Sequence, residues 1–121
     1  MKNKKRKNTV SYPLSLDQRL ALWVSADLLQ YLSIDTTPKF SSQVIESVCA
    51  SFEPVDGDER IYEFDFTAAH HRVCSYALKY ALLYLNGDFR YFDSPISDRI
   101  DSELHQLAPV IRQLADLFQV S

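Results

Sequence analysis

The chain has 121 residues, of which 46% are apolar and 24% charged, with a formal net charge of −3. This length and composition predict one folded domain, or a small domain with an extension, that buries a core without disulfides. No apolar run approaches about 18 residues and the N-terminus lacks an apolar signal core, which indicates an intracellular (cytoplasmic) protein without membrane spans. With only Gly57 and Gly87, glycine-rich nucleotide-binding loops are excluded.

The positive charge is gathered at the N-terminus. Five of the 13 basic residues lie in residues 1–8, which leaves eight basic against 16 acidic residues, or −8, for the rest. These five residues are Lys2, Lys4, Lys5, Arg6 and Lys7. Residues 1–8 are predicted to be a disordered basic arm, and an acidic body confines nucleic-acid contact to this end. A solubilising tail or a nuclear-import signal would have the same composition.

Residues 9–14 alternate between apolar and polar side chains, which predicts a short strand with two different faces. The apolar face carries Val10, Tyr12 and Leu14, and the opposite face carries Thr9, Ser11 and Pro13. A strand this short needs a partner, and no hairpin mate is evident nearby. The sequence therefore predicts a strand with no partner in its own chain.

The first two helices are predicted from the capping residues at their N-termini. Ser15, with Gln18 three residues later, forms a capping box for a helix over residues 16–32 that has two apolar stripes. Thr37 before Pro38 predicts the start of a second helix that ends near Phe52. Residues 9–53 would thus form one segment, followed at residues 54–66 by an acidic loop or short strand.

The C-terminal part, residues 67–121, is predicted to be a helical hairpin packed as one body. Thr67 caps a helix that stops at Gly87, and the last helix begins near Ser97 with a kink or restart at Pro109. The fold class is therefore mainly α: a short N-terminal β-strand followed by four main helices, with a possible short strand near 60–66. The last helix carries a heptad-like apolar seam that we expect to contact a partner. The expected interface residues of this seam are Leu104, Leu107, Ile111 and Leu114.

The strand and capped helix over residues 10–20, with Ser42, Val44 and Ile45 in the second helix, resemble the ribbon-helix-helix family of DNA-binding proteins. The resemblance implies that two copies pair their N-terminal strands into a ribbon that enters the major groove. The implied nucleic-acid contacts are Lys4, Lys5, Arg6, Lys7, Thr9 and Ser11, with Thr37 near a phosphate. The implied partner interface holds Val10, Tyr12 and Leu14.

Groups able to carry chemistry are few. His70 and Cys74 share a helical face beside His71, as metal-ligand pairs do, but no spacing recruits further ligands. The three tyrosines Tyr76, Tyr80 and Tyr84 are interpreted as core residues, and stacking on bases is the alternative. We therefore expect no metal, no cofactor and no catalytic residue.

The sequence favours a non-enzymatic DNA-binding regulator, a homodimer that binds duplex DNA through its paired strand and basic arm, with RNA as another possible ligand. The alternative is a small helical protein-interaction subunit or adaptor, within a nucleoprotein assembly or elsewhere. In that case the seam of the last helix would contact the partner and the arm would be incidental.

Overall fold

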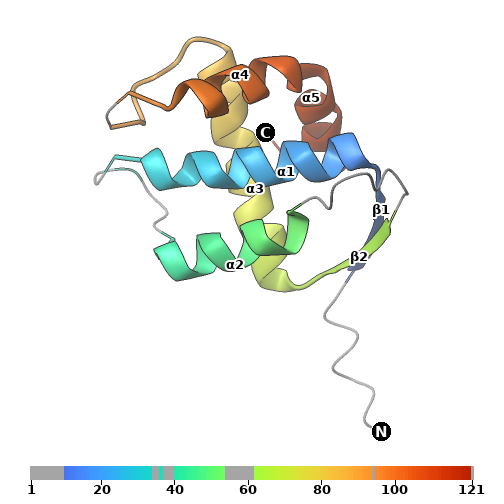
Figure 1. Cartoon of the computed structure of the whole chain (residues 1–121). Coiled ribbons are helices and arrows are strands. Elements are labelled where there is room, and N and C mark those ends of the chain that lie inside the picture. Colours follow the sequence, from blue (N-terminus) through green and yellow to red (C-terminus); the bar gives the residue numbers. More distant parts are fainter. Residues whose placement is uncertain (1–9, 34–35, 37–39, 54–61, 94, 121) are drawn as a thin grey trace, which may run out of the picture.

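The computed structural model describes residues 10–33, 36, 40–53, 62–93 and 95–120. These residues form a mainly α-helical protein with a short two-stranded sheet, as predicted (Figure 1). In chain order the elements are β1 (Val10–Leu14), α1 (Leu16–Leu28), the 3-10 helix η2 (Leu29–Tyr31), α2 (Ser42–Phe52), β2 (Tyr62–Phe66), α3 (Ala68–Leu85), α4 (Asp98–Gln106) and α5 (Ala108–Leu117).

Helix α1 lies at the centre of the fold. It packs against α2, α3, α4 and α5, and Figure 1 shows it between α2 on one side and the α4–α5 pair on the other. Its side chains Leu22, Val24 and Leu28 are completely or almost completely buried. The prediction of a first helix is therefore confirmed, but α1 ends at Leu28 and η2 takes the place of its predicted last turn up to residue 32. Burial on both sides makes α1 the element around which the others assemble.

Local capping sets the helix starts. The Ser15 hydroxyl accepts a hydrogen bond from the Gln18 amide, and the Gln18 side chain accepts one from the Ser15 amide. Thr67 and His70 form the same reciprocal arrangement at the start of α3. Each pair provides partners for N–H groups that the first helical turn leaves without intrahelical acceptors.

The expectation that the N-terminal strand has no partner in its own chain is wrong. Strand β1 pairs antiparallel with β2, with Val10 opposite Phe66 and Leu14 opposite Tyr62. The proposed short strand near residues 60–66 is thus real and is the missing partner. The main-chain groups of a strand pair with any edge that packing brings alongside, whatever its distance in sequence.

The alternation of β1 is confirmed for its described side chains. Leu14 is fully buried, and the Tyr12 ring lies 5.3 Å from Phe118 and 5.1 Å from Phe66. Ser11 and Pro13 are exposed on the other face. The sheet therefore attaches to the body through one face, against α3 and the end of α5.

The predicted start of the second helix at Thr37 is wrong. Helix α2 begins at Ser42, and the Ser41 hydroxyl caps it by accepting from the Val44 amide at 3.1 Å. Thr37 lies outside the described residues. A serine just ahead of an apolar stripe is an equally good cap, and the prediction based on Thr37 and Pro38 did not consider Ser41.

Pro109 divides the last predicted helix in two, as expected. Helix α4 ends at Gln106, and α5 starts at Ala108 with Pro109 in its first turn, where a missing N–H has little cost. The expectation that the seam is a partner interface is not met by its central residues. Leu104, Ile111 and Leu114 are fully buried within this chain, and Leu107 is half-buried at the junction.

Candidate functional site

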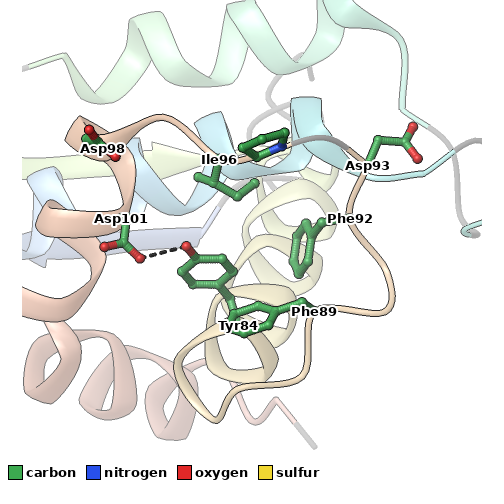
Figure 2. Close-up of a pocket in the computed structure, with 8 residues that line it drawn as sticks. Tyr84, Phe89, Phe92, Asp93, Ile96, Asp98 and Asp101 are labelled. Atoms are coloured by element: carbon green, nitrogen blue, oxygen red, sulfur yellow. Dashed lines mark hydrogen bonds between the residues drawn. The ribbon is translucent and has the colours of Figure 1, made fainter.

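A pocket of about 360 Å³ opens between the end of α3, the connection that follows it and the start of α4 (Figure 2). Its lining falls into aromatic rings, carboxylates and two further apolar side chains. The rings belong to Tyr84, Phe89 and Phe92; the carboxylates to Asp93, Asp98 and Asp101; the apolar side chains to Pro95 and Ile96.

The chain reverses direction at the end of α3 because of Gly87. This glycine has φ +85°, a left-handed conformation that side chains disfavour, and its amide donates to the Tyr84 carbonyl at 3.0 Å. The Asp88 amide donates to the Leu83 carbonyl at 2.9 Å, which completes the turn. The glycine stop predicted from sequence is confirmed, and it brings the following aromatic residues back alongside Tyr84.

The connection after α3 is hydrogen-bonded to the end of η2 and to the residues that follow it. The Ser33 amide donates to the Tyr91 carbonyl and the Asp93 amide to the Tyr31 carbonyl, each at 2.8 Å. Leu32 and Phe92 form an isolated antiparallel bridge between these two hydrogen bonds. These main-chain hydrogen bonds on both sides of Phe92 hold this wall of the pocket in a fixed position.

The three rings stand at steep angles to one another. Tyr84 and Phe92 are perpendicular, with ring centroids 5.7 Å apart, and Tyr84 and Phe89 are inclined at 64° with centroids 5.0 Å apart. Tyr84 is only 9% exposed, whereas Phe89 is 57% exposed. A phenylalanine that leaves most of its surface in water contributes little to the core, and this one lines the open side of the pocket.

The Tyr84 hydroxyl donates a hydrogen bond to one Asp101 carboxylate oxygen at 2.6 Å (Figure 2). Burial, the hydrogen bond to Asp101 and the charge of Asp101 raise the pKa of Tyr84 to about 12. The phenol therefore stays neutral and keeps donating at neutral pH. The His105 Nδ1 atom lies 3.6 Å from the same Asp101 oxygen, so the second carboxylate oxygen is the less crowded acceptor.

The other two carboxylates, Asp93 and Asp98, are exposed at opposite sides of the pocket (Figure 2). In the described part of the chain, neither forms an ion pair within 4 Å. Asp98 and Asp101 lie in the first turn of α4, at the positive end of the helix dipole. The two rim carboxylates therefore carry negative charge that has no ion-pair partner in this part of the chain.

The neighbouring arginines are directed elsewhere. Arg99 pairs with Asp27 at 2.8 Å and with Glu103 at 2.9 Å. Arg90 pairs with Asp88 at 2.9 Å, and this contact lowers the pKa of the Asp88 carboxyl. Each arginine is thus held by a carboxylate outside the pocket lining.

The residues predicted to contact nucleic acid are not brought together in the described structure. Ser11 lies on the exposed face of the sheet and donates to Asp65, opposite it on β2. The others, Lys4, Lys5, Arg6, Lys7, Thr9 and Thr37, lie outside the described residues. Of the predicted strand interface, Tyr12 and Leu14 pack within this chain, and Val10 is paired through its backbone with Phe66.

The contacts of His70, His71 and Cys74 are those of residues that stabilise the fold. His70 caps α3, the His71 ring packs 5.6 Å from Tyr12, and Cys74 is fully buried, which raises the pKa of its thiol. Among the described residues, no three His, Cys, Asp or Glu side chains are placed to hold a metal ion.

The His70 cap predicts a specific pH dependence. Its Nδ1 accepts from the Thr67 amide at 3.1 Å, and burial and the nearby His71 lower the pKa of His70 below 6.5. Between the lowered pKa and 6.5 the unfolded chain binds more protons, so stability falls as the pH falls through this window. His70→Gln keeps a capping side chain without the titration. Its thermal midpoint should therefore decline less than that of the parent protein over this range.

The control for this prediction is the range above neutral pH, where His70 is uncharged in both the folded and the unfolded chain. There the midpoints of His70→Gln and the parent protein should change in parallel. An equal decline for His70→Gln and the parent protein would show that the cap does not titrate.

Sequence reasoning missed the pocket, because it interpreted Tyr84 as a core residue and assigned no role to Asp93, Asp98 or Asp101. The available signal was the mixture of aromatic and acidic residues over residues 88–101. That signal does not reveal that Tyr84 and Asp101 meet.

Within the described residues, no helix combines the length and apolar character needed to cross a bilayer. Comparisons of the chain with protein-family models, with curated proteins and with solved structures find no match.

Proposed function

We propose that this protein is a non-enzymatic helical interaction module that binds a positively charged segment of a partner protein in the aromatic–acidic pocket. The observation that carries this proposal is the convergence of three aromatic rings and three carboxylates on one cavity of about 360 Å³. Aromatic faces and carboxylates both attract cations, and the two rim carboxylates have no ion-pair partner in the described part of the chain.

The expected affinity follows from the size of these contacts. A cation over an aromatic face contributes about 0.5–1 kcal/mol when exposed and about 2 kcal/mol when desolvated. An exposed ion pair contributes roughly 0–1 kcal/mol and weakens with added salt. A single cationic side chain therefore binds weakly, and useful affinity requires a segment whose neighbouring residues also contact the protein surface.

Duplex DNA is the second candidate ligand, supported by the five positive charges of Lys2 to Lys7 and by the resemblance of residues 10–20 to ribbon-helix-helix proteins. It ranks second because β1 already has a partner in β2. The exposed face of the sheet also carries Glu63 and Asp65 beside Ser11, and these carboxylates repel phosphates. DNA contact would thus depend on the arm rather than on the strand.

The two ligands are separated by titrating the full-length protein with a fluorescent lysine-rich peptide and, in parallel, with a short DNA duplex. We expect the peptide to bind, and Phe89→Ala or Asp98→Asn to weaken it about five- to tenfold, the equivalent of about 1–1.4 kcal/mol. Leu117→Ala, at an exposed apolar position of α5, is the control and should not change peptide binding.

Two results would contradict the proposal. One is peptide binding that Phe89→Ala and Asp98→Asn both leave unchanged, with thermal midpoints confirming that the variants are folded. The other is binding of the duplex alone, lost when Lys4, Lys5, Arg6 and Lys7 are replaced by glutamine, which would favour the DNA-binding function instead.

A further inference from the structure

We infer that the pocket selects the ammonium group of a lysine side chain over the guanidinium group of an arginine. This inference rests on the proposed function and adds the chemical class of the bound group. It depends on the angles between the rings, the placement of the carboxylates and the hydrogen bond between Tyr84 and Asp101.

The ring angles favour a compact cation. A guanidinium is planar and gains most by lying flat against aromatic faces, as in a slot between parallel rings. Here the Phe92 ring is perpendicular to the Tyr84 ring, and the Phe89 ring is inclined to the Tyr84 ring at 64°. A guanidinium that lay flat on Tyr84 would therefore be perpendicular to Phe92 and could not stack on both rings. An ammonium is a compact point charge without a preferred plane, and it can approach rings in different orientations together.

The placement of the carboxylates also favours an ammonium over a guanidinium. A guanidinium binds best when two parallel N–H groups meet both oxygens of one carboxylate. Asp101, partly buried beside Tyr84, accepts the tyrosine hydroxyl on Oδ1, and the His105 Nδ1 atom lies 3.6 Å from the same oxygen, so a two-oxygen contact there is crowded on one side. Asp93 and Asp98 lie on different sides of the pocket (Figure 2). Separate single acceptors suit the three diverging donors of an ammonium.

The size of the pocket is compatible with this ligand. Its volume of about 360 Å³ lies at the lower end of the range for sites that enclose small molecules, roughly 300–1,000 Å³. Ile96 lies across the cavity from Tyr84 (Figure 2) and offers an apolar surface to the methylene stem of a lysine.

Two sources could supply the lysine. One is a basic segment of another protein. The other is the N-terminal arm of a second copy of this chain, which carries Lys2, Lys4, Lys5 and Lys7 against a single arginine, Arg6. Both sources present the same ammonium group. For the arm of a second copy, the opposite charges of the arm and of the acidic remainder of the chain also favour binding.

The test compares three fluorescent peptides that are identical except that their basic positions are all lysine, all arginine or all acetyl-lysine. With the full-length protein we expect the lysine peptide to bind about fivefold more tightly than the arginine peptide. The acetylated peptide, which lacks the charge, should not bind. Equal or tighter binding of the arginine peptide overturns this inference but leaves the proposed function standing. Failure of both charged peptides overturns the proposed function as well.

Tyr84→Phe tests the physical cause of the selectivity. This change retains the ring but frees the Asp101 oxygen, so the arginine peptide should gain affinity and the lysine peptide should change little. If the preference for lysine is the same in Tyr84→Phe as in the parent protein, the role assigned to the hydrogen bond is wrong. Thermal midpoints confirm that the variant is folded.

A full-length variant with Lys2, Lys4, Lys5 and Lys7 replaced by glutamine distinguishes the two sources. If arms of second copies fill the pocket, this variant binds added lysine peptide more tightly and loses concentration-dependent self-association in sedimentation experiments. If the lysine comes from another protein, peptide affinity and self-association are unchanged. Loss of lysine-peptide binding in this variant would overturn the inference, because binding would then depend on residues outside the pocket.

Discussion

Leu114→Asp is expected to unfold the protein or to lower its free energy of unfolding by more than about 4 kcal/mol. Leu114 lies in α5 and is 0% exposed, within the same core as Leu104 and Ile111. The substitution removes about 1.5–3 kcal/mol of apolar burial and places a carboxylate where water does not reach it. A loss of this size approaches the whole stability of a domain of this length. Circular dichroism during urea unfolding measures it.

Leu117→Asp is the matched control for this change. It introduces the same residue three positions later on the same helix, where the side chain is 47% exposed. Its free energy of unfolding should stay within about 0.5 kcal/mol of the parent value. If Leu114→Asp folded normally and lost only the binding of a partner, the seam would be an interface after all.

Phe66→Ala is expected to cost about 3–5 kcal/mol of stability, the usual range for removing a buried phenylalanine ring. Phe66 is 1% exposed, and its ring lies 5.1 Å from Tyr12 and 5.5 Å from both Phe52 and Phe118. It therefore joins the sheet to α2 and α5. Urea unfolding measures the cost, and amide exchange should show β1 and β2 losing protection together.

Phe89→Ala provides the comparison, because it removes the same ring from a site that is 57% exposed. We expect a cost of about 1 kcal/mol or less, arising mainly from its contact with Tyr84. Similar losses for Phe66→Ala and Phe89→Ala would show that the sheet does not depend on the ring of Phe66.

The helices could be predicted because their signals are local. Ser15 with Gln18, Thr67 with His70, and Gly87 act on backbone groups within one turn of themselves, and each lies at a helix boundary in the structure. The alternation in β1 is local in the same sense, since it follows from the geometry of an extended chain. The start of α2 was predicted wrongly at Thr37, because Ser41 is an equally good cap and is the residue that caps α2 in the structure.

The pairing of β1 was not predictable in this way. Its partner begins at Tyr62, far along the chain, and the connection between them includes the whole of α1 and α2. The interpretation of β1 as a strand awaiting a second copy followed from searching only the neighbouring sequence. Backbone N–H and C=O groups are the same in every strand, so the sequence does not specify which strand edge will pair with β1. Only the packed structure could identify β2.

By itself the sequence determined the elements of this protein, their order, most of their boundaries and the acidic character of all but the N-terminus. The tertiary structure decided which apolar faces meet, so that Leu104, Ile111 and Leu114 became core rather than a docking surface. It also decided that Tyr84 and Asp101 share one pocket. The physical reason is that an apolar stripe or an aromatic ring packs against any complementary surface, and its spacing in sequence does not specify which one.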